Sequence, residues 1–389
     1  MSQTSSQPQS RRTLIILYTT AAVLFWASLY LYMPTLSVYA KTKTADLAPV
    51  GIALAQYGLW QALARFPLGI VADWVGRRKP FLIVGFIIAG LGALVMGQAG
   101  TIEGLTFGRA LTGLAASSWV LISVGYNSLF APEEAVRATT MLTGIISLAR
   151  ALASFATGPL NTLGGYPLAF FAAAATGGLA AAVMLLVREQ PRPPKQPSLH
   201  SLKTLVTRAD VIVPSLLCAV LQFAMWTGTF TFSPILAARL GASDVSLSLL
   251  TSMNILLVVA GSFAASAAVK RVGSRAMVVL SFVLIGIATG LLAVANSLAV
   301  VFVAQFCFGL ASGVGYPVLM GLSIRHVDED QRASAMGLFQ ATYGLGMFGG
   351  PWLSGILANN IGVQPMFAIV GAVCFVIGMV GVRKLTNGH

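Results

Sequence analysis

Three arginines lie inside apolar stretches of this chain and are the side chains best placed to do chemistry: Arg65, Arg109 and Arg150. A cation at the centre of a membrane helix costs about 2.5 to 3.5 kcal/mol on insertion scales, so it must face a cavity or a partner. A guanidinium stays charged and offers five N–H donors, which suit a carboxylate or a phosphate. We expect the two deeper arginines, Arg109 and Arg150, to line an anion site. Arg65 lies closer to a helix end, where snorkelling competes with any ligand role.

Unlike these arginines, the carboxylates lie outside the apolar stretches. All eleven fall in predicted loops or at the ends of apolar stretches: Asp46, Asp73, Glu103, Glu133, Glu134, Glu189, Asp210, Asp244, Asp328, Glu329 and Asp330. The three histidines also lie outside the apolar stretches, so no ordinary proton carrier is expected in the membrane. The buried arginines therefore lack a predicted acidic partner. An anionic solute would supply the missing charge, and a pump for cations is disfavoured.

Aromatic and amide side chains could complete a solute pocket. The candidates beside Arg109 and Arg150 are Trp26, Tyr30, Trp226, Gln222, Asn254 and Gln340, with Phe230 and Gln305 as neighbours. The alternative for each is ordinary helix packing, in which polar side chains bond across helices for about 0.6 kcal/mol. Trp26 and Trp226 favour the pocket more strongly, because they occupy matching positions in the two halves of the chain.

Other chemistries have no signature here. The sequence has neither a nucleotide-binding Gly-rich loop with Lys and Ser/Thr nor a polar cluster of catalytic residues, so we expect no enzyme activity. Cys218, Cys307 and Cys374 lie in apolar stretches without metal-ligand spacing, which predicts neither a metal nor a cofactor. The net charge of +13 comes from short basic clusters rather than one basic face, which disfavours nucleic acid as a partner.

The elements that must position these residues are membrane helices. The chain is 57% hydrophobic and only 9% charged, against about 25% charged residues in a soluble domain. Stretches long enough to cross a bilayer lie near 13–39, 47–72, 80–99, 103–126, 139–162, 167–187, 211–237, 246–269, 276–295, 298–322, 334–358 and 363–382. Only helices satisfy their own backbone in such segments, so we expect an all-α membrane protein with twelve transmembrane helices.

The spacing of the stretches predicts two six-helix bundles. The longest polar gap is rich in proline and separates six stretches from six. The expected parts are a tail at 1–12, a bundle at 13–187, a linker at 188–210, a bundle at 211–382 and a tail at 383–389. On this topology eighteen basic residues lie on the side of both termini and three on the other side, which places both termini in the cytoplasm.

The two halves also repeat. The matched pairs are Trp26 with Trp226, Pro34 with Pro234, Gly76 with Gly273, Arg109 with Gln305, Gly113 with Gly309, and Arg137 with Arg332. The offset falls slowly from 200 to 195 residues, as duplication followed by small loop deletions would leave it. Parallel six-helix repeats of this kind are a transporter architecture.

Two motifs carry a family resemblance. Gly69-x3-Asp73-x2-Gly76-Arg77-Arg78, after the second stretch, resembles the signature loop of the major facilitator superfamily, with Trp74 where a basic residue is usual. Leu105-x3-Arg109-x2-Thr112-Gly113 resembles a helix 4 motif of its drug-antiporter branch, with Thr112 for the usual glutamine. A glycine-rich motif of that branch is incomplete in the fifth stretch and nearly complete in the eleventh, at 337–355.

The resemblance implies a conformational latch at the first motif. Asp73 would pair in one conformation with the N-terminal end of the eleventh stretch, at 334–358, or with Arg137, and separate in the other. The residues assigned to this latch are Gly69, Asp73, Gly76, Arg77, Arg78 and Arg137. The alternative is a solvated helix end in which the loop arginines merely screen the carboxylate of Asp73.

The resemblance also implies a function. We expect a multi-pass secondary active transporter of the cell (cytoplasmic or inner) membrane, acting as a monomer in the lipid bilayer, that moves a small organic anion by alternating access. Efflux is favoured over uptake. The alternatives left open are a proton-coupled importer of a metabolite and a non-transporting membrane sensor on the same fold.

The orientation can be tested by chemical labelling. In a background without native cysteines, a Ser198→Cys variant should react with an impermeant thiol reagent only from the cytoplasm, and Ser243→Cys only from outside, because basic loops stay in the cytoplasm. The measurement is labelling in sealed vesicles of known orientation. The reverse pattern would refute the predicted topology.

Overall fold

The N-terminal bundle of the computed structural model is built from long helices. The structure describes residues 9–189, 205–328 and 331–385, so the predicted tails and linker lie partly outside the described residues. The helices of this bundle are α1 (Arg11–Tyr30) with α2 (Leu36–Lys41), α3 (Leu47–Val75), α4 (Lys79–Gln98), α5 (Ile102–Ala116) with α6 (Trp119–Asn127), and α7 (Ala135–Leu185). A short 3-10 turn, η1 (Pro132–Glu134), precedes α7.

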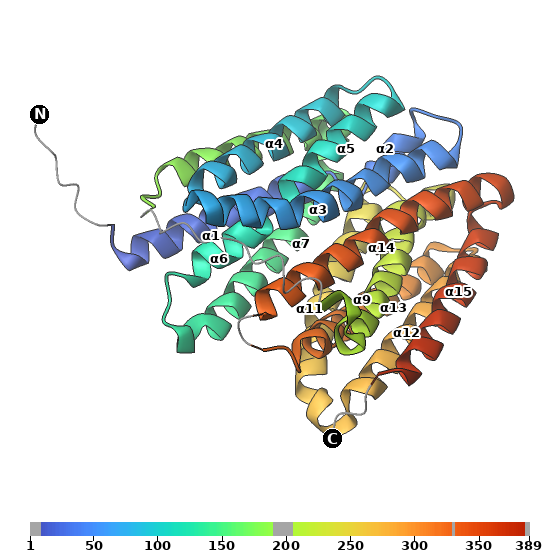
Figure 1. Ribbon diagram of the computed structural model, residues 1–389. Coiled ribbons are helices and arrows are strands. Elements are labelled where there is room, and N and C mark those ends of the chain that lie inside the picture. Colours follow the sequence, from blue (N-terminus) through green and yellow to red (C-terminus); the bar gives the residue numbers. More distant parts are fainter. Residues whose placement is uncertain (1–8, 190–204, 329–330, 386–389) are drawn as a thin grey trace, which may run out of the picture.

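The C-terminal bundle repeats this arrangement. Its helices are α9 (Ala209–Met225) with the π-helical turn η2 (Trp226–Phe232) and α10 (Ser233–Arg239), α11 (Asp244–Val272), α12 (Ser274–Ala293), α13 (Leu298–Ile324), α14 (Arg332–Ile361) and α15 (Val363–Arg383). Figure 1 shows the blue-to-green bundle beside the yellow-to-red one.

The predicted twelve passes are confirmed. Nine helices of the described chain are long and apolar enough to cross a membrane. One of them, α7, has 51 residues and makes two passes, since a bilayer needs about 20. The remaining two passes are α3 and α14, which have 29 and 30 residues. They pack against each other where the bundles meet.

Several expected continuous helices are broken, and proline or glycine explains most breaks. The first pass is interrupted at residues 31–35, around Pro34, and the seventh has its π-helical turn just before Pro234. Proline cannot donate a backbone hydrogen bond, so nearby carbonyls lose their helical partner. Conversely, the fifth and sixth passes, expected as separate helices, form one long element kinked at Gly164 and Gly165, where Gly165 has φ +68°.

The bundles touch most closely at the end away from the termini. There the Leu47 N–H donates to the Asn359 side chain at 2.9 Å, and the Asn161 amide donates to Asp244 at 2.9 Å. Nearer the middle of α7, Ser252 of α11 donates to the Ala151 carbonyl at 3.0 Å. Figure 1 shows the bundles diverging toward the start of α1 and the end of α15. The molecule is thus closed at one end and splayed at the other.

Close helix packing predicts a stability effect at Gly346. A Cβ there would lie 2.0 Å from the backbone oxygen of Ala219 in α9, so Gly346→Ala must force α14 and α9 apart. Overpacking of this kind costs about 1 to 3 kcal/mol, and we expect the apparent melting temperature in detergent to fall by several degrees. Gly321→Ala is the matched control, because nothing lies within 4 Å of its added Cβ. Equal melting temperatures for the two variants would contradict this packing.

Candidate functional site

Arg109 on α5 is the more buried of the two predicted anion-binding arginines, with 1% of its surface exposed. Its guanidinium carbon lies 4.2 Å from the ring centre of Tyr57 on α3 and 5.9 Å from that of Trp226 on η2. Its Nη2 donates to the Met33 sulfur at 3.5 Å, and sulfur is a weak acceptor. Its Nε and Nη1 atoms are buried without a partner among the described residues.

Arg150 on α7 has a similar aromatic environment. Its guanidinium carbon lies 4.2 Å from the ring centre of Tyr30 and 5.1 Å from that of Trp26, both on α1. Its Nη2 donates to the Tyr30 hydroxyl. Its Nε, like the indole N–H of Trp26, is buried without a described partner. The structure therefore brings Trp26 and Tyr30 against Arg150, as a solute site would require.

Aromatic stacking carries the site across the bundle interface. Tyr57 of the N-terminal bundle stacks on Trp226 of the C-terminal bundle, with ring centres 5.2 Å apart and an angle of 21°. Trp226 also packs against Phe230 at 5.0 Å, and Trp26 packs edge-on against Trp119 at 5.8 Å. The cluster of Arg109, Arg150, Trp26, Tyr30, Tyr57 and Trp226 is called the arginine–aromatic site below.

The predicted amides are less closely tied to this site. Asn254 donates its amide to the backbone and side-chain oxygens of Gln305, at 3.0 and 3.2 Å, within the C-terminal bundle. Gln222 and Gln340 are half-buried on α9 and α14. The described contacts do not place these amides against Arg109 or Arg150, and their role in binding stays a prediction.

No described carboxylate neutralises the arginine–aromatic site. Ion pairs among the described residues join Arg11 with Glu134, Arg78 with Asp73, and Arg208 and His326 with Asp210. All of these lie at helix ends. A ring face attracts a cation by about 0.5 to 2 kcal/mol but accepts no strong hydrogen bond, so the N–H donors stay available. The arrangement suits an anion with an apolar body.

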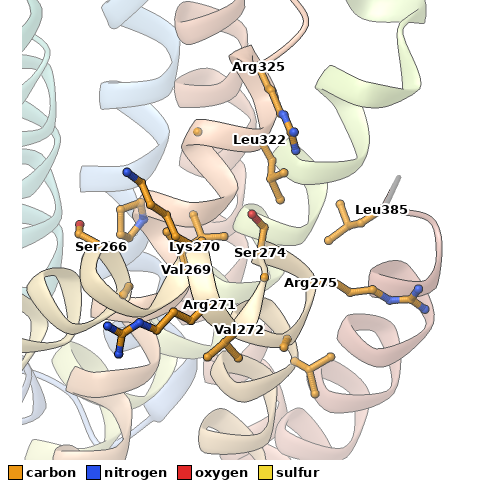
Figure 2. Close-up of a pocket in the computed structure, with 17 residues that line it drawn as sticks. Ser266, Val269, Lys270, Arg271, Val272, Ser274, Arg275, Leu322, Arg325 and Leu385 are labelled. Atoms are coloured by element: carbon orange, nitrogen blue, oxygen red, sulfur yellow. The ribbon is translucent and has the colours of Figure 1, made fainter. Parts of the chain in front are cut away.

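A large pocket among the described residues lies elsewhere. It has a volume of about 1080 Å³ at the terminus-side end of the C-terminal bundle, and its basic lining residues are Lys270, Arg271, Arg275 and Arg325. In Figure 2, Arg325 points toward Ser274, while Arg271 and Arg275 extend away in opposite directions. All lining residues belong to one bundle, whereas a transport site must contact both. This pocket is therefore a feature of the basic loops, not the solute site.

Comparison with known proteins identifies the family. A model described as the Major Facilitator Superfamily matches residues 18–236 and again residues 215–387, so each bundle matches it. The chain belongs to the major facilitator superfamily. It is therefore a multi-pass transporter of the cell membrane, as the two sequence motifs predicted.

Individual relatives of this facilitator are distant. An uncharacterized MFS-type transporter of Methanocaldococcus jannaschii is 19% identical over 362 residues, which cover 90% of this chain and 93% of the relative. A chloramphenicol efflux pump of Mycobacterium tuberculosis is 30% identical over 191 residues, 48% of this chain and 45% of the pump. The solved structure of a bacterial homolog of the human lysosomal transporter Spinster shares the fold, with a TM-score of 0.81 at 14% identity over 98% of both chains. These relatives are transporters, not enzymes.

In the facilitator's signature loop, Asp73 is bonded within the loop itself. Asp73 accepts a hydrogen bond from Arg78 at 3.3 Å, and the described structure gives no bond from Asp73 to Arg137 or to the start of α14. Arg77 and Arg137 are exposed, and nothing lies within 4 Å of a Cβ added at Gly69. The tight turn needs Gly76, whose φ is +69°. This arrangement fits a latch at the splayed end of the molecule, although its switching stays a prediction.

A second carboxylate at this loop was missed by the sequence reasoning. Glu189 accepts hydrogen bonds from the backbone N–H groups of Arg78 and Lys79, at 2.7 and 2.9 Å. It thereby caps the N-terminus of α4, which has no side-chain cap of its own. Lys79 in turn donates to the carbonyls of Leu185 and Val187 at the end of α7. These bonds fasten the signature loop to the sixth pass.

The latch hypothesis predicts separate effects on binding and transport. Asp73→Asn keeps the shape but removes the charge, so solute binding should stay within a few-fold while transport falls about tenfold, equivalent to about 1.4 kcal/mol in the conformational step. The measurements are equilibrium binding and uptake into proteoliposomes. Asp46→Asn, an exposed carboxylate at the opposite end of α3, is the control. Normal transport by Asp73→Asn would show that Asp73 is only a solvated helix end.

Proposed function

We propose that this facilitator moves a small organic anion across the membrane by alternating access. The observation that carries the proposal is the state of Arg109 and Arg150. Both guanidiniums hold buried N–H groups without a partner among the described residues, and no described carboxylate pairs with either. An unpaired buried charge is costly, and a carboxylate or phosphate on the solute offsets that cost when it binds.

The aromatic residues define the rest of the solute. Trp26 and Trp226 offer flat apolar surfaces on opposite bundles, so they suit an aromatic or aliphatic body attached to the negative group. Trp226 of one bundle stacks on Tyr57 of the other. Reorientation of the bundles would therefore change the distance between these two rings and the shape of the site around the solute. Such a change is what alternating access requires.

Efflux is the direction we favour. With the basic loops in the cytoplasm, the splayed end of the described conformation faces the cytoplasm, where a solute to be exported would enter. The similarity to a chloramphenicol efflux pump over about half of the chain supports the same direction. A non-transporting sensor would not need the Asp73 loop, which this chain keeps.

The anion hypothesis makes a charge-specific prediction. Arg109→Gln and Arg150→Gln should each weaken binding of an anionic solute about ten- to hundredfold, because each removes a charge-assisted hydrogen bond worth about 1.5 to 3 kcal/mol. A carboxylate found by thermal-shift screening is titrated against wild type and both variants, alongside its methyl ester.

The ester and a surface variant serve as controls. Binding of the neutral ester should stay within about threefold in both variants, since it has no charge to lose. Arg239→Gln, an exposed cation on α10, should bind both compounds as wild type does. Equal loss of anion and ester, or a best ligand that is a cation, would mean that the two arginines are structural.

A further inference from the structure

One buried face of α3 continues from the arginine–aromatic site toward the splayed end of the molecule. Tyr57, Gln61 and Arg65 are spaced four residues apart, so they lie in line on one side of the helix. Gln61 is 4% exposed and Arg65 is 5% exposed. Since a helix rises about 1.5 Å per residue, Arg65 lies about 12 Å beyond Tyr57 along the axis.

Arg65 crosses the bundle interface as Arg109 does. Its Nη1 donates to the hydroxyl of Tyr343 on α14 at 2.5 Å, and its guanidinium carbon lies 5.9 Å from the centre of that ring. Its Nε is buried without a described partner, and so is the side-chain oxygen of Gln61. The tyrosine hydroxyl is neutral, and the described ion pairs do not include Arg65. The charge of Arg65 is therefore uncompensated.

Arg65 lies near the end of the contact between α3 and α14. Next to it, Phe66 lies 3.5 Å from a Cβ added at Gly337, so α3 and α14 are still in contact at this level. One turn further along α3, Gly69 has nothing within 4 Å of its added Cβ. Arg65 thus lies where the bundle contact ends, between the arginine–aromatic site and the splayed opening.

We propose that Arg65, with Gln61 and Tyr343, forms a second anion subsite between the arginine–aromatic site and the cytoplasmic opening. The inference rests on the proposed function and extends it. The described conformation is already splayed at this end, so Arg65 keeps its bond to Tyr343 and offers its unpartnered Nε to the negative group of the solute. The Gln61 amide N–H group is a further donor to that group. A solute leaving or entering the central site thereby passes from one guanidinium to the next.

The test uses charged thiol reagents, so it needs no knowledge of the solute. Gln61→Cys is made in the full chain after Cys218, Cys307 and Cys374, all buried, are replaced by alanine. The rates of modification by anionic sulfonatoethyl methanethiosulfonate and by cationic trimethylammonioethyl methanethiosulfonate are then measured from the cytoplasmic side. We expect the ratio of the anionic to the cationic rate to fall about tenfold when Arg65→Gln is added, because a local positive charge concentrates anions.

Two matched variants isolate the charge. Arg65→Lys keeps the charge and should keep the ratio within about threefold of the parent, which also separates loss of charge from misfolding. Arg383→Gln removes an exposed cation at the end of α15 and should leave the ratio unchanged. An unchanged ratio in Arg65→Gln, or no reaction of Gln61→Cys with either reagent, would refute the second subsite. Arg65 would then serve only to hydrogen-bond α3 to α14.

This result is separable from the test of the central site. If the carboxylate and its ester lose affinity equally in the Arg109 and Arg150 variants while the reagent ratio still falls with Arg65→Gln, the proposed solute class is wrong and Arg65 lines a positively charged path. If the carboxylate titration succeeds and the ratio does not change, only the second subsite is wrong.

Discussion

The contact of guanidinium groups with aromatic rings is the interaction on which this site depends. Arg109 lies over Tyr57, and Arg150 lies over Tyr30 and Trp26, each with at least one buried N–H donor free within the described chain. Rings stabilise a cation enough to permit its burial but leave its hydrogen-bonding capacity unused. A carboxylate partner would have used that capacity and closed the site to anions. The described site thus combines two features that act together: no carboxylate pairs with its arginines, and aromatic rings line it.

Movement of the bundles depends on a different constraint, which is how closely their backbones approach. A Cβ at Gly51 would lie 2.3 Å from the Pro351 oxygen, and one at Gly158 would lie 2.5 Å from the Val245 backbone. Glycine at these points lets α3 meet α14 and α7 meet α11 without interlocking side chains. A smooth contact of this kind can open by rotation of one bundle against the other. The Asp73 loop lies at the other end of α3, away from Gly51.

Sequence reasoning was sufficient where the information is local or repeated. Hydropathy predicted the twelve passes, and the internal repeat matched Trp226 with Trp26 in corresponding positions of the two halves. Contacts between distant passes were not predictable, since nothing in a single sequence pairs Tyr57 with Trp226 or Glu189 with the start of α4. The amide of Asn254 shows the same limit, because Gln305 is its partner only once α11 and α13 are packed. The break in the first pass could have been anticipated from Pro34, whereas the π-helical turn depends on how α9 continues into α10.

The charge of the solute also bears on how transport is driven. None of the described ion pairs brings a carboxylate to Arg109 or Arg150, so under the proposed function the site itself offers the solute no proton-carrying acid. An anion needs no such carrier to leave a cell whose interior is negative. Moving one negative charge outward across 100 mV releases about 2.3 kcal/mol, enough for roughly a fiftyfold concentration ratio at equilibrium. Under the proposed function, two uncompensated arginines and the absence of acids therefore favour the same direction. The membrane potential would drive anions out through this site and oppose their uptake.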